Sequence, residues 1–168
     1  TSSSGNVSGF QFRVQGNGID KTVTSDSKGK IKVENLQEGT YTVTEILPND
    51  SAYYCTSTNP QTVNVEAGKT STVTFNNEKK QWRVTVYKED RESGGAQADA
   101  TLDGAVYGLY KDSVLVKEYT VKNGTFTTDA YDCGTGYTLK EISAPPGYQL
   151  DTTVYNLNDY SAPGKCSG

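Results

Sequence analysis

The stretch Gly136-Tyr-Thr-Leu-Lys-Glu-Ile142 decides the fold, because it repeats an earlier stretch, Gly39-Thr-Tyr-Thr-Val-Thr-Glu-Ile46. Upstream, the segment that begins at Gly9 aligns with the segment that begins at Gly104, and the two offsets differ by one residue. Internal similarity at a fixed period indicates repeated structural modules. The chain is therefore predicted to contain two copies of one module.

The two modules are predicted to cover residues 1–79 and 80–168, with the polar segment 76–80 as their junction. Val-, Thr- and Tyr-rich runs with a period of two alternate with Gly, Asn, Asp and Pro, which is typical of short strands joined by turns. Segment 89–98 carries two glycines and no apolar face, so it is predicted to be a loop. This spacing predicts an all-β sandwich or barrel. The clearest predicted strands are 10–14, 30–33, 40–46, 62–65, 70–75, 82–88, 105–110, 114–121, 125–127 and 137–142.

Composition excludes several classes of function. The 168 residues include no histidine, which removes Ser–His and Cys–His catalysis and His-ligated metal sites, and we expect neither a metal nor a cofactor. The net charge of −4, with basic residues spread along the chain, argues against a nucleic-acid partner. No apolar run approaches the roughly 18 residues that a transmembrane helix needs, so no membrane insertion is expected. Methionine is also absent, even at position 1, which fits a processed or excised fragment.

Four predicted strands continue their apolar face into a polar residue, namely Lys88, Glu141, Glu45 and Asn77. Alternate residues of a strand share one face, so these side chains are expected to point toward the core. An unpaired buried ion is costly, and buried charges therefore come in pairs or change protonation state. The alternative is that each residue is the last of its strand and reaches solvent at the sheet edge.

Three motifs resemble the collagen-adhesin B-type (Cna B-like, prealbumin-like) domains of Gram-positive surface adhesins and pilins. In the second module they are VTVYKED, GAVYGLY and GYTLKEISAPPGY, and the first module has the matching EGTYTVTEI and GKTSTVTFNN. The resemblance covers nearly the whole chain. It implies two tandem Ig-like/prealbumin-like β-sandwich modules.

The resemblance also implies a Lys–Asn isopeptide bond that forms autocatalytically once per module. A desolvated lysine attacks an Asn side chain, and a buried Glu shuttles the protons. In the second module, Lys88 is the implied nucleophile and Glu141 the implied proton shuttle. Asn156 and Asn158 lie near the expected place of the Asn, but not on a convincing strand.

In the first module the implied Asn is present and the lysine is missing. Glu45 and Asn77 match the family pattern, but no lysine precedes Phe10 at the expected place. The first module is thus expected to lack its first strand and the second module its last strand. Two explanations are open: a fragment cut out of phase from a longer repeat protein, or strands supplied by neighbouring chains.

Three cysteines are too few for a disulfide scaffold. Cys133 precedes the strand of Glu141 and Cys166 lies in the terminal tail, so these two are the disulfide candidates that would pin the tail. Cys55 would then be free or would bridge two chains. Three isolated thiols are the alternative.

Together these observations predict a non-enzymatic structural role in an extracellular, cell wall-anchored or pilus-associated protein. The modules would form a mechanically and proteolytically resistant rod, with neighbouring repeats or subunits of the same surface protein as partners. The rival prediction is a module that binds a glycan or a host protein. An enzyme such as a cysteine hydrolase is a remote third interpretation, because histidine is absent.

Overall fold

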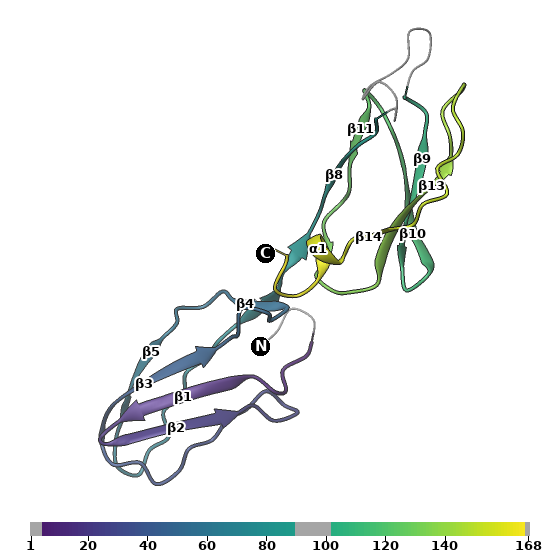
Figure 1. Ribbon diagram of the computed structural model, residues 1–168. Helices are drawn as coiled ribbons and strands as arrows, with labels where there is room; N and C mark the ends of the chain where they lie inside the picture. The colour runs from purple at the N-terminus through teal and green to yellow at the C-terminus, as the bar shows by residue number, and fades with distance from the viewer. Residues whose placement is uncertain (1–4, 90–101, 167–168) are drawn as a thin grey trace. The chain divides into compact units, whose positions relative to one another are not determined.

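The computed structural model describes residues 5–89 and 102–166, and these residues form an all-β protein with one short helix. The chain folds into two compact units, unit 1 (Thr1–Lys80) and unit 2 (Gln81–Gly168). Figure 1 shows the strands of each unit, and each unit is described by itself below. The loop predicted over 89–98 lies, apart from Glu89, outside the described residues.

Unit 1 contains a four-stranded antiparallel sheet and a small two-stranded one. The strand order of the larger sheet is β2-β1-β3-β5, and β4 pairs with β6 (Figure 1). The bounds are β1 Gln11–Gly16, β2 Ile19–Thr24, β3 Gly39–Ile46, β4 Tyr53–Cys55, β5 Gln61–Val65 and β6 Asn77–Lys79.

Unit 2 repeats the four-stranded sheet in the order β10-β9-β13-β14, and two further strand pairs, β11 with β8 and β12 with β7, complete it (Figure 1). A single helical turn, α1, lies near the C-terminus. The bounds are β7 Gln81–Trp82, β8 Thr85–Tyr87, β9 Val106–Lys111, β10 Val114–Thr120, β11 Thr125–Thr127, β12 Tyr131–Asp132, β13 Tyr137–Ser143, β14 Tyr155–Asn156 and α1 Asn158–Ser161.

The first two strands of each four-stranded sheet form a hairpin of the same kind. Asn17 and Gly18 join β1 to β2, and Asp112 and Ser113 join β9 to β10, all four with positive φ. Two-residue hairpin loops favour this conformation because its twist matches that of the flanking strands. The repeat in the sequence is therefore also a repeat in topology.

Several predicted strands differ from the observed ones. Segments 30–33 and 70–75 have no strand assignment, and 82–88 is divided into β7 and β8 around Arg83 and Val84. The missed strand β2 has no fully buried residue, because it lies at the edge of its sheet and its sequence is mostly polar. Edge strands lack the apolar alternation on which the prediction depended.

The two cores differ in size among the described residues. Unit 1 buries a small cluster, and unit 2 buries a larger one that is rich in aromatic rings. The buried cluster of unit 1 consists of Phe12, Val14, Tyr41, Val43 and Phe75. That of unit 2 consists of Trp82, Ala105, Tyr107, Leu109, Tyr119, Val121, Phe126, Tyr137, Leu139, Leu157 and Cys166.

Candidate functional sites at Glu141 and Glu45

Lys88 and Glu141 meet inside unit 2. Strand β13 buries Tyr137, Leu139 and Glu141 on one face, as its alternation requires. Lys88 follows β8 and is held there by a 2.8 Å hydrogen bond from its backbone N–H to Gly124 O. Lys88 Nζ lies 3.2 Å from Glu141 Oε1, and the side chains are 12% and 0% exposed. The two core-facing charges of this unit therefore form a buried ion pair.

Tyr107, on the adjacent strand β9, completes this ion pair. Lys88 Nζ donates a 3.4 Å hydrogen bond to Tyr107 Oη. Burial by itself lowers the pKa of Lys88, but its interactions with Tyr107 and Glu141 outweigh burial, and the net shift of the pKa is upward. This direction is the opposite of the fall expected for a desolvated lysine. As an ion pair, Lys88 is a protonated amine, and it becomes a nucleophile only when it passes its proton to a neighbour.

The second oxygen of Glu141 is held by the backbone. The N–H of Asp151 donates a 2.6 Å hydrogen bond to Glu141 Oε2, and Tyr155 Oη donates to Asp151 Oδ2. Sequence reasoning did not find Asp151, because it lies in a loop whose path back to β13 has no periodic signal. The carboxylate of Glu141 is thus fixed from two sides.

Asn156 and Asn158 lie away from Glu141 along β13. Asn156 is exposed and pairs with Thr138, which is on the opposite face of β13 from Glu141. Asn158 Oδ1 accepts a 3.3 Å hydrogen bond from the N–H of Gly136, five positions or about 16 Å along an extended strand from Glu141. The structure therefore does not bring either amide to Lys88.

Glu45 and Asn77 form the corresponding site of unit 1. Glu45 ends the buried face of β3, and Asn77 begins β6 opposite Cys55. Asn77 Nδ2 donates a 2.7 Å hydrogen bond to Glu45 Oε2, and the two residues are 4% and 3% exposed. Asn59 holds the backbone of Glu45 through a hydrogen bond in each direction. Unit 1 therefore has the buried carboxylate and the amide.

The other two oxygens of this pair, Glu45 Oε1 and Asn77 Oδ1, are buried without a hydrogen-bond partner in the described part of the chain. Both residues line a groove of about 640 Å³, which we call the unit 1 groove. Residues 28–32, 70 and 72–75 line the same groove, together with Val7, Phe10 and Phe12. Buried polar atoms are nearly always hydrogen-bonded, so this pair of orphaned oxygens requires an explanation.

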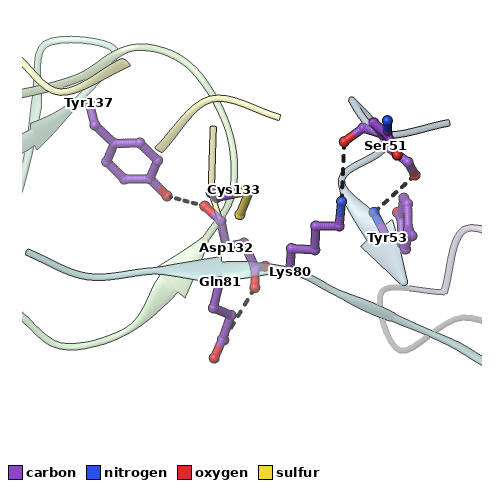
Figure 2. The surroundings of a disulfide bond; sticks show 9 residues. Ser51, Tyr53, Lys80, Gln81, Asp132, Cys133 and Tyr137 are labelled. Atoms are coloured by element: carbon purple, nitrogen blue, oxygen red, sulfur yellow. Dashed lines mark hydrogen bonds between the residues drawn. A yellow bond between two sulfur atoms is a disulfide. The ribbon is translucent and has the colours of Figure 1, made fainter. Parts of the chain in front are cut away.

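Cys133 and Cys166 form a disulfide in unit 2. Figure 2 shows this region, with Tyr137 Oη donating a hydrogen bond to the backbone oxygen of Asp132, next to Cys133. Cys166 lies in the tail that follows α1 and is buried in the core. Cys55 in unit 1 is a free, half-buried thiol, and burial is the main cause of its raised pKa. The tail is thus covalently attached to the strand connection before β13.

Comparison with known proteins assigns the fold. The model of the family described as SpaA prealbumin-like fold domain matches residues 1–79 and 83–158. The chain belongs to this family. The two matches confirm the resemblance to prealbumin-like domains and the prediction of two tandem modules.

Several solved structures that are similar to this chain are longer than it. The Bacillus anthracis TIE protein is similar over 89% of this chain and 27% of its own length, with 24% identity and a TM-score of 0.75. A streptococcal ancillary pilin is matched over 89% of this chain and 53% of its own, with 22% identity and a TM-score of 0.41. The pilus adhesin SpaC from Lactobacillus rhamnosus GG is matched over 92% of this chain and 24% of its own, with 16% identity and a TM-score of 0.43. The chain spans about half or less of these structures. No curated protein matches the sequence.

Two further findings concern metals and membranes. Within residues 5–89 and 102–166, no group of three or more His, Cys, Asp or Glu side chains could hold a metal ion. No helix of these residues is long and apolar enough to cross a membrane.

Proposed function

We propose that this chain is a structural segment of an extracellular pilin or adhesin of a Gram-positive bacterium, and that its modules are stabilised by Lys–Asn isopeptide bonds. The observation that carries the proposal is the ion pair of Lys88 with Glu141, buried inside a prealbumin-like module. A buried ion pair is weak evidence for stability by itself, because desolvation offsets the attraction between the charges. A role in forming the isopeptide bond would explain why this unit buries the two charges.

The reaction requires an Asn amide beside Lys88. Transfer of the ammonium proton to Glu141 Oε1, 3.2 Å away, leaves a neutral amine. The amine nitrogen attacks Cγ of the Asn, and Glu141 passes its proton to Nδ2 as the Cγ–Nδ2 bond breaks. Glu141 then takes up the second proton that the attacking nitrogen loses on becoming an amide, so that the carboxyl ends protonated. One amide replaces another and one ammonia molecule is released, so no co-reactant is needed.

A strand that carries this Asn fits beside β8. On one edge β8 pairs with β11, and no other strand in the described part of unit 2 pairs with it. In unit 1 the residues directly before Asn77 have no strand assignment, and the amide of Asn77 donates to Glu45. We propose that a segment of the same kind, from a neighbouring repeat or subunit, lies along β8 and brings its Asn to Lys88. Neighbouring subunits of the same surface protein are therefore the proposed partners.

A peptide with the sequence Thr70–Glu78 tests this proposal, because it contains Asn77. Mixed with the intact chain, it is expected to form an adduct whose mass equals the sum of the two minus one ammonia. Lys88→Arg keeps the positive charge but removes the nucleophile, so this variant should form no adduct. Glu141→Gln removes the proton shuttle and should slow the reaction by about 100-fold or more, the usual range for loss of a general base.

Two results would contradict the proposal. One is the absence of any adduct with the unchanged chain. The other is an adduct that forms equally with the Lys88→Arg chain, which would place the reaction elsewhere. Peptide mapping of the adduct identifies the joined residues directly.

A further inference from the structure

A groove of about 520 Å³ lies in unit 2, and its lining includes neither Lys88 nor Glu141. We call it the unit 2 groove. Most of its lining comes from two segments that are far apart in the sequence. Residues 81–83 form β7 and the position after it, and residues 159, 160 and 165 belong to the tail that contains α1. Because α1 contacts β7, the tail and this strand form the groove together (Figure 1).

The tail side of the groove is anchored to the rest of unit 2. The Cys133–Cys166 disulfide attaches the end of the tail, directly after Lys165. The N–H of Gly134 donates a 2.8 Å hydrogen bond to the backbone oxygen of Ser161, which is fully buried and directly follows Tyr160. The backbone that carries these groove residues is therefore fixed before any ligand arrives, which lowers the entropic cost of binding.

Two cations of the groove have no counter-charge. Arg83 and Lys165 are exposed, and neither side chain makes a hydrogen bond or an ion pair with another residue of 5–89 and 102–166. By contrast, the exposed cation of Lys117 pairs with Asp129 at 2.6 Å. A guanidinium presents a fork of donors that matches a carboxylate, so Arg83 is free to bind a carboxylate from outside the chain.

An acidic side chain restricts the kind of anion that fits. Asp159 lines the same groove, is exposed, and makes no side-chain hydrogen bond within the described part of the chain. An ionised carboxylate accepts hydrogen bonds and cannot donate them, so Asp159 favours a ligand with hydroxyl groups. It also repels a bare anion. The groove thus requires a ligand that combines one negative group with hydrogen-bond donors.

An aromatic ring and an amide complete the lining. The side chain of Tyr160 is 56% exposed, whereas Trp82 is 4% exposed and belongs to the core. An exposed tyrosine offers an apolar face and a polar hydroxyl at once, which suits a ring that has both C–H and O–H groups. The amide of Gln81 lies at the edge of this region, where Figure 2 shows it 3.5 Å from Asp132 Oδ1.

We propose that the unit 2 groove binds a pyranose sugar that carries a carboxylate, such as a hexuronate or a sialate residue of a glycan. The carboxylate of the sugar pairs with Arg83, and Lys165 adds to the attraction. The sugar hydroxyls donate to Asp159, and the ring lies against Tyr160. This inference goes beyond the proposed function, because none of these residues takes part in the isopeptide chemistry.

A titration of the isotope-labelled intact chain with methyl β-glucuronide, followed by NMR, is the test. The indole N–H of Trp82 gives one signal in the groove, because the chain has a single tryptophan. Saturable shifts of this signal are expected, with a Kd in the range of about 1 mM that suits a ligand of this size. N-acetylneuraminate should shift the same signal.

Two probes dissect the ligand. Methyl β-glucoside has the same ring with a hydroxymethyl group in place of the carboxylate, and acetate has the carboxylate without the ring. Each should bind at least about tenfold more weakly than the glucuronide, because each leaves part of the lining without a partner.

Substitutions at exposed positions test the residues without disturbing the core. Arg83→Gln should weaken glucuronide binding at least about tenfold, since it removes the partner of the carboxylate. Tyr160→Ala should weaken it about threefold or more. The matched controls are Lys122→Gln and Tyr87→Ala, which change exposed residues of unit 2 outside the groove and should bind as well as the unchanged chain.

Asp159→Asn distinguishes a sugar from a simple anion by the sign of its effect. It should weaken glucuronide binding about threefold or more, because a neutral amide accepts hydrogen bonds from hydroxyls less strongly. It should strengthen the binding of acetate, because a repulsive charge is removed. The proposal would be overturned by unsaturable shifts with both acidic sugars or by equal affinity for the glucoside. Unchanged binding by Arg83→Gln, or tighter glucuronide binding by Asp159→Asn, would overturn it as well.

Discussion

Asn77 Nδ2 donates a 2.7 Å hydrogen bond to Glu45 Oε2 in unit 1, whereas the matching Glu141 of unit 2 contacts Lys88 Nζ at 3.2 Å. Each unit therefore buries a carboxylate with one of the two groups that an isopeptide bond joins. In unit 1 the carboxylate and the amide line a groove, and in unit 2 the amine follows β8, which pairs with β11 alone among the described residues. Because the buried carboxylate has an amide partner in unit 1 and an amine partner in unit 2, the same substitution is expected to affect the stability of the two units differently.

Glu141→Gln should destabilise unit 2 by about 3 kcal/mol, because removal of one partner leaves the Lys88 ammonium buried without its counter-charge. Trp82 is the single tryptophan and is 4% exposed in the core of unit 2, so its fluorescence reports the unfolding of this unit in urea. Glu118→Gln, at an exposed position of β10, is the control and should change the free energy of unfolding by less than about 0.5 kcal/mol. Equal urea midpoints for Glu141→Gln and Glu118→Gln would show that the ion pair contributes nothing to the stability of unit 2.

Strand alternation was sufficient to predict which faces are buried. It placed Glu45, Glu141 and Asn77 on core faces, and the structure buries all three. It did not predict that 30–33 and 70–75 have no strand assignment, because a sequence pattern reports the side-chain faces and not the presence of a neighbouring backbone. Strand β14 has only two residues, both exposed, so it has no apolar alternation to detect.

The contacts around the candidate sites depended on the path of the loops. The hydrogen bond from the N–H of Asp151 to Glu141 joins a loop to a strand, and no local pattern encodes it. The pKa of Lys88 rises instead of falling because Tyr107 and Glu141 surround the ammonium, which is a property of three separate elements. Periodicity identifies a buried charge but does not identify its partners.

Unit 2 should lose stability at alkaline pH through Lys88. The folded pKa of Lys88 is raised above its ordinary value of 10.5, so its stabilisation is fully present below that pH and is lost as the pH rises through the folded value. Burial also raises the pKa of Tyr107 above 10.0, which acts in the same direction. Urea midpoints from Trp82 fluorescence at about pH 8 and about pH 11 should fall less in Lys88→Met than in the unchanged chain. Lys122→Met, at an exposed position of unit 2, is the control and should keep the full fall. Parallel falls in all three chains would contradict this prediction.

Reduction of the Cys133–Cys166 disulfide should destabilise unit 2 and leave unit 1 unchanged. The bond spans 33 residues, and the chain-entropy estimate for a loop of this length is about 4 kcal/mol. Cys166→Ser should lower the urea midpoint from Trp82 fluorescence to a similar extent, and reductant should then have no further effect. Cys55→Ser in unit 1 is the matched control and should keep both the midpoint and its response to reductant. A reductant effect that persists in Cys166→Ser would show that a different cysteine pair is responsible.

Glu45→Gln should not lower the free energy of unfolding of unit 1, in contrast to the loss expected for unit 2 from Glu141→Gln. Glu45 has no cation partner among the described residues, so Gln removes a buried carboxylate without breaking an ion pair. The Gln oxygen can still accept from Asn77 Nδ2, and its amide can donate to the orphaned Asn77 Oδ1, so unit 1 should be unchanged or more stable by about 1 kcal/mol. Hydrogen exchange of the β1 and β3 amides measures the stability of unit 1 separately from that of unit 2. Faster exchange of these amides in Glu45→Gln than in the unchanged chain would mean that the carboxylate stabilises unit 1 even without a cation partner.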